Sequence, residues 1–448
     1  MRGLRSTIAL VVVLGGLGAY IYFVTWKTPE GDTSKKTDKV FAGLQADKIE
    51  ELRITSAGGD ATTAKKDNGT WQVLQPVTAK ADESEISGIT SALASIDVVR
   101  VIDENPSNLN EYGLSNPRIQ VDFKAAGDKE YRKLFIGEKS PTGADLFARR
   151  NDEKKVFLIP AFQETTVNKD SFALRDKSVL KFDREKVDGV EVAAAGKSLV
   201  MAKDGPEWKI KKPVETRADY GSVEGLVGRL QTIQMKSIAA DQASPADLKK
   251  YGLEKPEATV NINAGSARAT LLVGGKATDT TVYARDASKP AVVTVESALM
   301  DDLKKSADDY RRKDLFEFRA YNANRVELKR GNDVAVFERV KGQGENAQDK
   351  WKRVSPNPAD LDRDKVDAML AKLANMRASA FVESAPKTAQ PALEVHVKFD
   401  DGKKEERVSF VKADADVFAL RPGEPFGGID AQVEYCDSID KRRTHRAH

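Results

Sequence analysis

Residues 71–96 read WQVLQPVTAKADESEISGITSALASI, and this stretch decides the fold. Trp71 stands in an alternating apolar run that Pro76 ends, and Asp82 follows eleven residues after the tryptophan. At four, seven, eleven and fourteen residues beyond that aspartate the side chains are apolar: Ile86, Ile89, Leu93 and Ile96. This spacing is the buried stripe of an amphipathic helix, and aspartate is a preferred N-cap. The stretch therefore predicts a strand, a proline turn and a capped helix.

The same pattern occurs three times in the chain. The tryptophan, proline and aspartate recur with identical spacing at Trp208, Pro213 and Asp219, and at Trp351, Pro356 and Asp362. The stripe positions are again apolar: Val223, Leu226, Leu230 and Ile233, then Val366, Met369, Leu373 and Met376. In the first copy, Glu85 is placed to complete a capping box. Acid chemistry is the alternative for the aspartates, but capping explains their repetition better, and we interpret the tryptophans as core anchors.

A second motif follows the first two helices. It reads YGLSNP, with Tyr112, Gly113 and Pro117, and then YGLEKP, with Tyr251, Gly252 and Pro256. The glycine can adopt a positive φ that ends a helical turn, and the proline keeps the chain from re-entering a helix. An alternation typical of a half-buried strand comes next in every copy. Its apolar positions are Ile119, Val121 and Phe123, then Ala258, Val260 and Ile262, and finally Leu393, Val395, Val397 and Phe399.

The third copy departs from this motif. Pro386, Lys387 and Thr388 replace Tyr-Gly-Leu, and Val411 replaces a glycine that ends a strand in the other copies. His396 is out of phase with the apolar positions around it, which predicts a place on the opposite, exposed face. The sequence thus indicates two strong copies and one degenerate copy.

The N-terminus indicates a membrane segment. Arg2 and Arg5 precede an uncharged run in which residues 8–24 are long enough to cross a bilayer at the lower limit. An uncleaved signal-anchor is our interpretation, and a signal peptide cut after Gly18 is the alternative. A cationic start followed by an apolar run is typical of export, so we expect residues 27–448 on the periplasmic, extracytoplasmic side of the inner membrane.

Together these patterns predict an α+β fold class. An N-terminal transmembrane helix is expected to precede tandem repeats of a mixed module that is rich in strands and has one or two helices. The expected segments are a membrane anchor (1–27), a polar tether (28–40), two repeat domains (41–181 and 182–318) and a degenerate repeat domain (319–448).

The amino-acid composition limits the classes of function that we expect for this chain. Lysine and arginine number 72 against 69 for aspartate and glutamate, and this balance disfavours a nucleic-acid-binding protein. The chain has one cysteine, Cys436, and three histidines: His396, His445 and His448. A zinc site needs several such ligands, and the common catalytic motifs are missing from the sequence. We therefore expect no catalytic residue, no metal, no cofactor and no enzymatic activity.

Three arginines recur near the end of a predicted strand. They lie in LFARR, VYARD and VFALRP, at Arg149, Arg285 and Arg421. We predict that they form an interaction surface, and ion pairs across the strand face are the alternative.

The order of tryptophan strand, capped helix, YGLxxP, "IG" strand and "YAR" strand resembles the bacterial family named domain of unknown function 4340. The resemblance covers about residues 41–318, with a fainter third copy. It implies a membrane-anchored envelope protein, and many members look like companions of ABC-type transport systems, including those associated with gliding motility. The resemblance supplies no catalytic residues.

The expected function is that of a non-enzymatic auxiliary, scaffold or binding subunit in such a complex, with an ABC permease or ATPase as partner. One alternative is an envelope protein that binds peptidoglycan or polysaccharide. A less favoured alternative is a glycan hydrolase that works through a pair of carboxylates, because that chemistry needs neither histidine nor cysteine.

Overall fold

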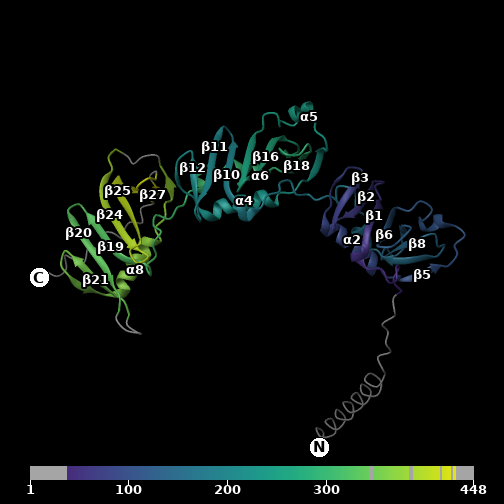
Figure 1. Ribbon diagram of the computed structural model, residues 1–448, viewed down its shortest axis with the longest axis horizontal. Coiled ribbons are helices and arrows are strands. Elements are labelled where there is room, and N and C mark those ends of the chain that lie inside the picture. Colours follow the sequence, from purple (N-terminus) through teal and green to yellow (C-terminus); the bar gives the residue numbers. More distant parts are fainter. Residues whose placement is uncertain (1–37, 343–347, 383–386, 414–415, 425–426, 430–448) are drawn as a thin grey trace, which may run out of the picture. The chain divides into compact units, whose positions relative to one another are not determined.

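Strands dominate each repeat because the alternating segments pair with one another into a continuous sheet. The computed structural model describes residues 38–342, 348–382, 387–413, 416–424 and 427–429. In it are three antiparallel sheets of nine strands, with the same strand order in each. Figure 1 labels strands of all three sheets along the chain. There are two compact units, Met1–Lys177 with the first sheet and Ser178–His448 with the other two.

The first repeat, within residues 38–177, has the strand order β4-β3-β2-β1-β6-β7-β8-β9-β5. Its strands are β1 (Ile49–Thr55), β2 (Ala61–Asp67), β3 (Thr70–Gln75), β4 (Ala79–Lys80), β5 (Arg100–Asp103), β6 (Ile119–Ala125), β7 (Arg132–Lys139), β8 (Asp145–Arg150) and β9 (Val156–Pro160). Helix α2 (Glu83–Ser95) joins β4 to β5, which are the two edge strands, and therefore crosses one face of the sheet. Short helical turns are η2 (Ala46–Lys48), η3 (Leu109–Tyr112) and α3 (Gln163–Val167).

The second repeat, residues 178–313, copies this arrangement. Its strands are β10 (Val187–Ala194), β11 (Lys197–Asp204), β12 (Glu207–Lys212), β13 (Thr216–Arg217), β14 (Ser237–Ala240), β15 (Ala258–Ala264), β16 (Ala267–Lys276), β17 (Thr281–Asp286) and β18 (Val292–Glu296). Helix α4 (Tyr220–Thr232) crosses the sheet. The shorter helices are η4 (Arg184–Lys186), α5 (Pro245–Lys250), α6 (Ala298–Leu303) and α7 (Ala307–Tyr310).

The third repeat begins at Asp314 and keeps the same strand order, although its sequence signature is weaker. Its strands are β19 (Ala323–Arg330), β20 (Asp333–Val340), β21 (Lys350–Ser355), β22 (Ala359–Leu361), β23 (Ala380–Phe381), β24 (Gln390–Phe399), β25 (Lys404–Ala413), β26 (Asp416–Leu420) and β27 (Gly427–Ile429). Helix α8 (Arg363–Ala374) is its crossing helix.

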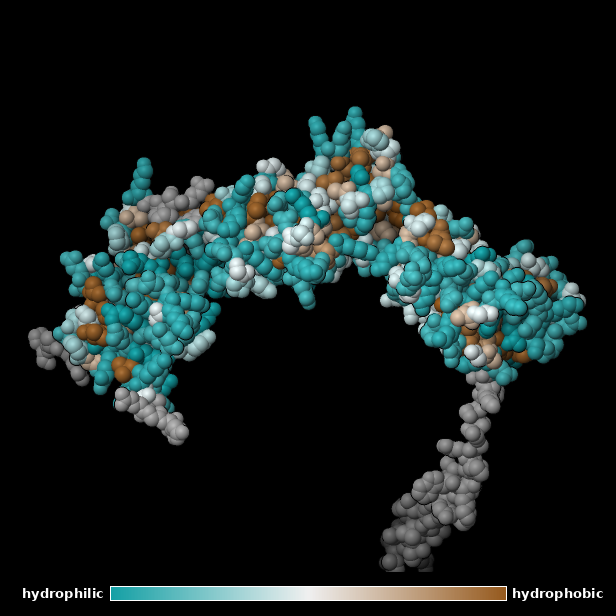
Figure 2. Space-filling model, viewed as in Figure 1, coloured by the Kyte–Doolittle hydropathy of each residue, from teal (hydrophilic) through white to brown (hydrophobic). Residues whose placement is uncertain are grey.

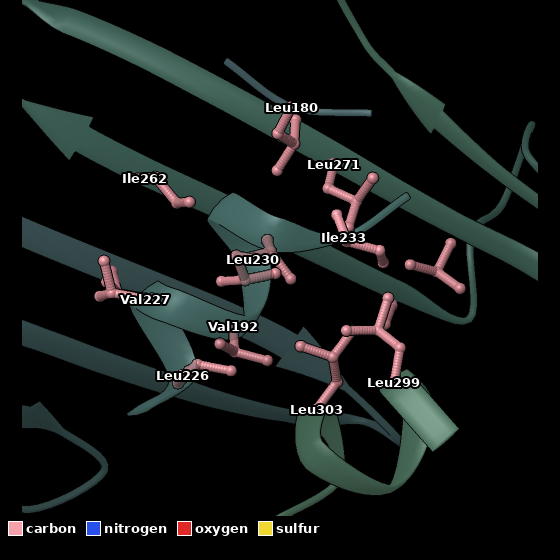
Figure 3. Packing of buried hydrophobic residues seen from close by; sticks show 14 of the residues in the cluster. Leu180, Val192, Leu226, Val227, Leu230, Ile233, Ile262, Leu271, Leu299 and Leu303 are labelled. Atoms are coloured by element: carbon pink, nitrogen blue, oxygen red, sulfur yellow. The ribbon is translucent and has the colours of Figure 1, made fainter. Parts of the chain in front are cut away.

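The crossing helices bury the predicted stripes against the sheets. Ten of the twelve stripe positions are buried, and the remaining two, Met369 and Met376, are partly buried against the third core. Figure 3 shows the second core, where Leu230 and Ile233 lie in one cluster with Leu271 of the sheet. Full burial of such a side chain contributes roughly 1.5–3 kcal/mol, so the stripe contributes much of the free energy that holds each helix on its sheet.

The tryptophans are core anchors, as predicted. Trp71, Trp208 and Trp351 are 5%, 2% and 1% exposed. In the second and third repeats the indole Nε1 donates a hydrogen bond to an acidic side chain on the crossing helix, at 3.0 Å in both cases. This bond satisfies the one polar atom that burial of the ring would otherwise leave without a partner.

The three aspartates cap the crossing helices, which confirms that prediction. Asp82 accepts hydrogen bonds from two backbone N–H groups in the first helical turn, and Asp219 and Asp362 accept from one each. The capping box expected from Glu85 is not the contact that this side chain makes, because its carboxylate lies 2.8 Å from Lys169 Nζ. A tertiary ion pair therefore stands in place of the expected local hydrogen bond to the backbone.

The predicted α+β class is wrong, because the described residues form mainly antiparallel β sheet. Strand β1 pairs with β6, which lies beyond the helix in sequence, so the strands before and after the helix join one sheet. One helix of 12 or 13 residues remains in each repeat. The sequence pattern showed each strand separately and did not show that all nine belong to one sheet.

The predicted transmembrane helix is not supported either. In the part of the chain that the structure describes, no helix is both long enough and apolar enough to cross a membrane. The segment on which that prediction rests, residues 1–27, lies outside the described residues, as do Cys436 and the last two histidines.

Candidate functional site

The Tyr-Gly-Leu motif covers the face of the sheet opposite the crossing helix. In the first repeat, Leu114 packs with Phe135 and Tyr112 in a small cluster separate from the main core. The Tyr112 ring lies 5.1 Å from that of Phe147. The second repeat forms the same cluster around Tyr251, whose ring lies 4.4 Å from that of Tyr283. The motif thus gives each of these sheets a second, smaller core.

A close approach of two chain segments explains why this motif occurs together with the "IG" strand. Gly113 and Gly252 have φ values of 68° and 72°, which favour glycine. A Cβ on Gly137 would lie 2.1 Å from the carbonyl oxygen of Tyr112, and one on Gly274 would lie 2.2 Å from that of Tyr251. Each strand glycine is therefore required by the turn that packs on it.

The third repeat has lost both halves of this pairing. Ile136, Val273 and Phe410 are equivalent, because each pairs with the central alanine of the next strand. The residue after Phe410 is Val411, where the other repeats have the strand glycine. Lys387 and Thr388 stand where the other repeats have Gly-Leu, and Pro386 lies outside the described residues.

Two of the three recurring arginines hold the same place in their sheets. Arg149 pairs with Phe135, and Arg285 pairs with Leu272, at equivalent positions of β8 and β17. The guanidinium carbon of Arg149 lies 4.1 Å from the Phe135 ring centroid. Arg285 donates from Nε to the Lys289 carbonyl at 2.8 Å. Both side chains are half-buried and lie on the face that carries the Tyr-Gly-Leu cluster.

Arg421 is not equivalent to these two. In the third sheet the matching position, opposite Ser409, is held by Leu420. Arg421 is one residue further on, and its Nη1 donates to the Leu315 carbonyl at 2.7 Å and to Glu406 at 2.8 Å. The structure therefore brings together no common surface from the three arginines, and an interaction role for Arg149 and Arg285 stays a prediction.

A different set of cations is equivalent in all three repeats. Each repeat starts with a lead-in segment, residues 39–40, 178–179 and 314–315, whose first residue forms a β-bridge just beyond the crossing helix. The carbonyl of the second residue accepts a hydrogen bond from a side-chain cation of the same repeat. The pairs are Arg150 with Val40, Lys289 with Val179, and Arg421 with Leu315.

Sequence reasoning missed this set because the cation changes in type and in position. Arg150 pairs across the sheet with Leu134, and the equivalent residue of the second repeat, opposite Leu271, is Asp286. The cation is supplied there by Lys289, three residues later, which lies 3.0 Å from Asp286. In the first and third repeats the cation stands two residues after the aligned alanine, at Arg150 and Arg421, but in the second repeat it does not, so the role common to all three is visible only in three dimensions.

The third repeat adds a buried carboxylate. Glu406 is 7% exposed and accepts hydrogen bonds from the backbone N–H groups of Glu317 and Phe318, at distances from 2.9 to 3.1 Å. Arg421 supplies its opposite charge. The carboxylate thus ties the segment before β19 to strand β25, and its contacts are structural.

Cations or hydroxyl groups hold several carboxylates in their charged form. Hydrogen bonds from Lys65 and Tyr131 lower the pKa of Glu51, and burial opposes this effect. Burial raises the pKa of Tyr310 to about 12. His396 lies on the face opposite the buried Val395, as predicted, but it is half-buried and not fully exposed, with Nε2 3.4 Å from Glu405 Oε2. Among the described residues, no group of three or more His, Cys, Asp or Glu is arranged to hold a metal ion.

Comparison with known proteins yields one family. No curated protein matches the chain. A solved structure with some likeness is a DNA polymerase sliding clamp from Pseudomonas aeruginosa, at 6% identity over 88% of this chain and 93% of that one. Its TM-score is 0.14, which supports no inference about the fold.

The family model described as "Domain of unknown function (DUF4340)" matches twice, at residues 71–210 and 208–395. Each match starts at a repeated tryptophan, so it combines the later part of one structural repeat with the first strands of the next. The two matches cover more than half of the 448 residues, and the chain therefore belongs to this DUF4340 family.

Proposed function

We propose that this chain is a non-enzymatic scaffold or binding protein of the bacterial cell envelope. It acts as an auxiliary subunit of an ABC-type transport complex or a gliding-motility complex, and contacts a permease or an ATPase. The observation that supports this proposal is the use of the repeated residues. The tryptophans pack in cores, the aspartates cap helices and the motif glycines admit close turns. The recurring residues therefore have structural roles within each module.

The surfaces of the modules, in contrast, differ from repeat to repeat. The turn between the first two strands has Asp60 in the first repeat and Lys197 at the equivalent position of the second. Leu420 replaces the arginine of the other two sheets. Figure 2 shows a visible face that is mostly hydrophilic, with small separate hydrophobic patches. Serial modules with different surfaces can contact several sites of a large complex, and linked contacts strengthen one another.

We place residues 27–448 on the extracytoplasmic side of the inner membrane. The cationic start with Arg2 and Arg5, followed by an apolar run, is typical of export and supports this location. An alkaline phosphatase fused to the C-terminus should be active in whole cells, because the enzyme folds only after export. An inactive phosphatase, together with an active cytoplasmic reporter at the same position, would reverse the assignment.

The partner can be identified by capture. A tagged full-length chain is cross-linked in cells and purified from solubilised membranes, and mass spectrometry should find an ABC permease or ATPase enriched over an untagged control. The informative variant is Arg149→Leu with Arg285→Leu, because Leu420 shows that this register accepts leucine. Loss of capture would assign the contact to these arginines. Capture of no envelope protein by the wild-type chain would contradict the scaffold function.

Binding to peptidoglycan or polysaccharide is the second candidate. Exposed aromatic side chains favour it, since sugar rings stack on such surfaces, and Phe162, Tyr220 and Tyr321 are 68%, 61% and 78% exposed. Co-sedimentation with purified sacculi, lost in Tyr220→Ala and Tyr321→Ala, would support this candidate over the first. Release of soluble glycan fragments in the same assay would instead favour a hydrolase.

A further inference from the structure

A pocket of about 530 Å³ opens at one end of the second sheet. Buried apolar side chains from β10, β11 and α6 line it: Val192, Ala194, Leu199 and Leu303. Figure 3 shows Leu303 and Val192 in the neighbouring core. The volume lies in the range of about 300–1,000 Å³ that is usual for sites of small ligands. An opening with an apolar lining is therefore large enough to hold an organic molecule.

At the equivalent place in the first repeat, two hydrogen bonds join the neighbouring segments. Asp60 Oδ2 accepts from the backbone N–H of Ser171 at 2.5 Å. Asn168 Oδ1 accepts from the backbone N–H of Ala57 at 2.9 Å. These two bonds join the segment after α3 to the turn between β1 and β2. Ser56 and Thr62, on either side of that turn, are buried polar residues.

The second repeat has neither of the side chains that accept these two bonds. The strand register aligns Ser56 with Ala194, Asp60 with Lys197 and Thr62 with Leu199. Counting from the equivalent bridge residues Arg175 and Arg311 aligns Asn168 with Lys304 and Ser171 with Ala307. Lys197 and Lys304 cannot accept the two hydrogen bonds of Asp60 and Asn168, so neither bond can form in this repeat, where the pocket lies.

The charges around the pocket are mainly positive. Three exposed lysines line it: Lys197, Lys304 and Lys305. Asp308 is the acidic residue of the lining, and it pairs with Arg311 at 3.2 Å. Phe381 of the third repeat also borders the pocket, with its ring centroid 3.6 Å from the Arg311 guanidinium carbon. An apolar interior next to exposed ammonium groups suits a ligand with an apolar body and an acidic head.

We propose that this pocket binds a single-chain anionic amphiphile. The acyl chain lies against Leu199 and Leu303, where it is removed from water. The acidic head pairs with Lys197 and Lys304 at the surface, where charge-assisted hydrogen bonds form. The proposal concerns this pocket, which lies mainly on the second repeat and is bordered by Phe381 of the third, and it does not depend on the partner complex.

Isothermal titration calorimetry with dodecanoate, below its micelle concentration, tests the proposal on the full-length chain. One molecule per chain is expected to bind, while dodecyltrimethylammonium and acetate do not. Two double variants introduce the residues of the first repeat: Ala194→Ser with Leu199→Thr, and Lys197→Asp with Lys304→Asn. Each should weaken dodecanoate binding at least tenfold. Lys249→Asn, at an exposed lysine outside the pocket lining, should leave it unchanged.

Several outcomes overturn the proposal. They are absence of dodecanoate binding, equal binding of the cationic amphiphile, and unchanged affinity in both double variants. Hydrogen exchange gives a second measurement that needs no variant, since dodecanoate should slow exchange in residues 192–199 and 303–308 of the wild-type chain. Protection spread evenly over all three repeats would show non-specific adsorption and would also contradict a single site.

Discussion

The stability of the third repeat should be especially sensitive to substitution of Glu406, because the carboxylate of this residue is buried. Its side chain is 3% exposed and lies 2.8 Å from Arg421 Nη1. It also accepts the backbone N–H groups of Glu317 and Phe318. Glu406→Ala removes the nearest carboxylate from the half-buried Arg421, whose other partners, Glu317 and Glu424, lie at 3.8 and 3.7 Å. Loss of one partner of a buried ion pair costs about 3–5 kcal/mol. The two backbone N–H donors lose their acceptor as well, which costs about 1–3 kcal/mol of stability each if no water molecule replaces the carboxylate.

These contributions are not additive, because Arg421 also donates to the Leu315 carbonyl and keeps that bond. We therefore expect Glu406→Ala to lower the free energy of unfolding of the third repeat by about 4 kcal/mol. Glu406→Gln retains the shape and one acceptor oxygen, and should cost about half as much. The neighbouring Glu405 is the control, since its side chain is 64% exposed. Glu405→Ala should change stability by less than about 1 kcal/mol.

Hydrogen exchange with mass spectrometry can measure the loss of stability in the full-length chain, because it reports opening free energies for peptides of each repeat separately. Peptides from β24 and β25 should lose protection in Glu406→Ala, while peptides of the first repeat should not. If the third repeat keeps its protection to within about 1 kcal/mol, the carboxylate is not the main partner of Arg421, and this reasoning fails.

Two further predictions concern the first two repeats. Burial raises the pKa of Glu164, but hydrogen bonds from Lys139 and Arg118 outweigh it and hold the pKa below 4.5. Because the pKa of Glu164 is lower in the folded state, the charged carboxylate stabilises the fold fully above pH 4.5, and this stabilisation is lost as the pH falls through the folded-state pKa. In urea unfolding, the stability of Glu164→Gln should therefore depend less on acid pH than that of the wild-type chain. An identical pH dependence of the two proteins would contradict this role of Glu164. Gly274→Ala should destabilise the second repeat by at least about 2 kcal/mol, because its Cβ would lie 2.2 Å from a backbone carbonyl. Gly275→Ala meets the same atom at 3.8 Å, so equal melting temperatures for the two variants would refute the steric explanation.

The local elements of this fold were predictable because their signals lie close together in the chain. The positions Leu226 and Leu230 are one helical turn apart, and Asp219 caps the helix that begins at the next residue. The alternation in β15 is equally local, and it places Val260 and Ile262 in the core. Periods of 3.6 and 2 residues follow from backbone geometry alone, so a few neighbouring residues were enough to predict each helix and strand.

Other features depend on residues that are distant in sequence, and the sequence did not reveal them. Arg150 reaches the Val40 carbonyl across 110 residues, and Arg421 reaches that of Leu315 across 106. The sequence also aligned Arg421 with Arg149 wrongly, because both are arginines near the end of a strand. The strand register shows that Leu420 is the residue equivalent to Arg149.

The sequence by itself therefore determined the three-fold repetition, the capped helices with their apolar stripes, the core tryptophans and the family. Tertiary structure alone decided that nine strands form one sheet, which cations hold the lead-in carbonyls, and that Leu199 and Leu303 line a common pocket. The reason is that helix and strand periodicity are properties of adjacent residues, whereas pairing partners and cavities arise only when distant segments meet.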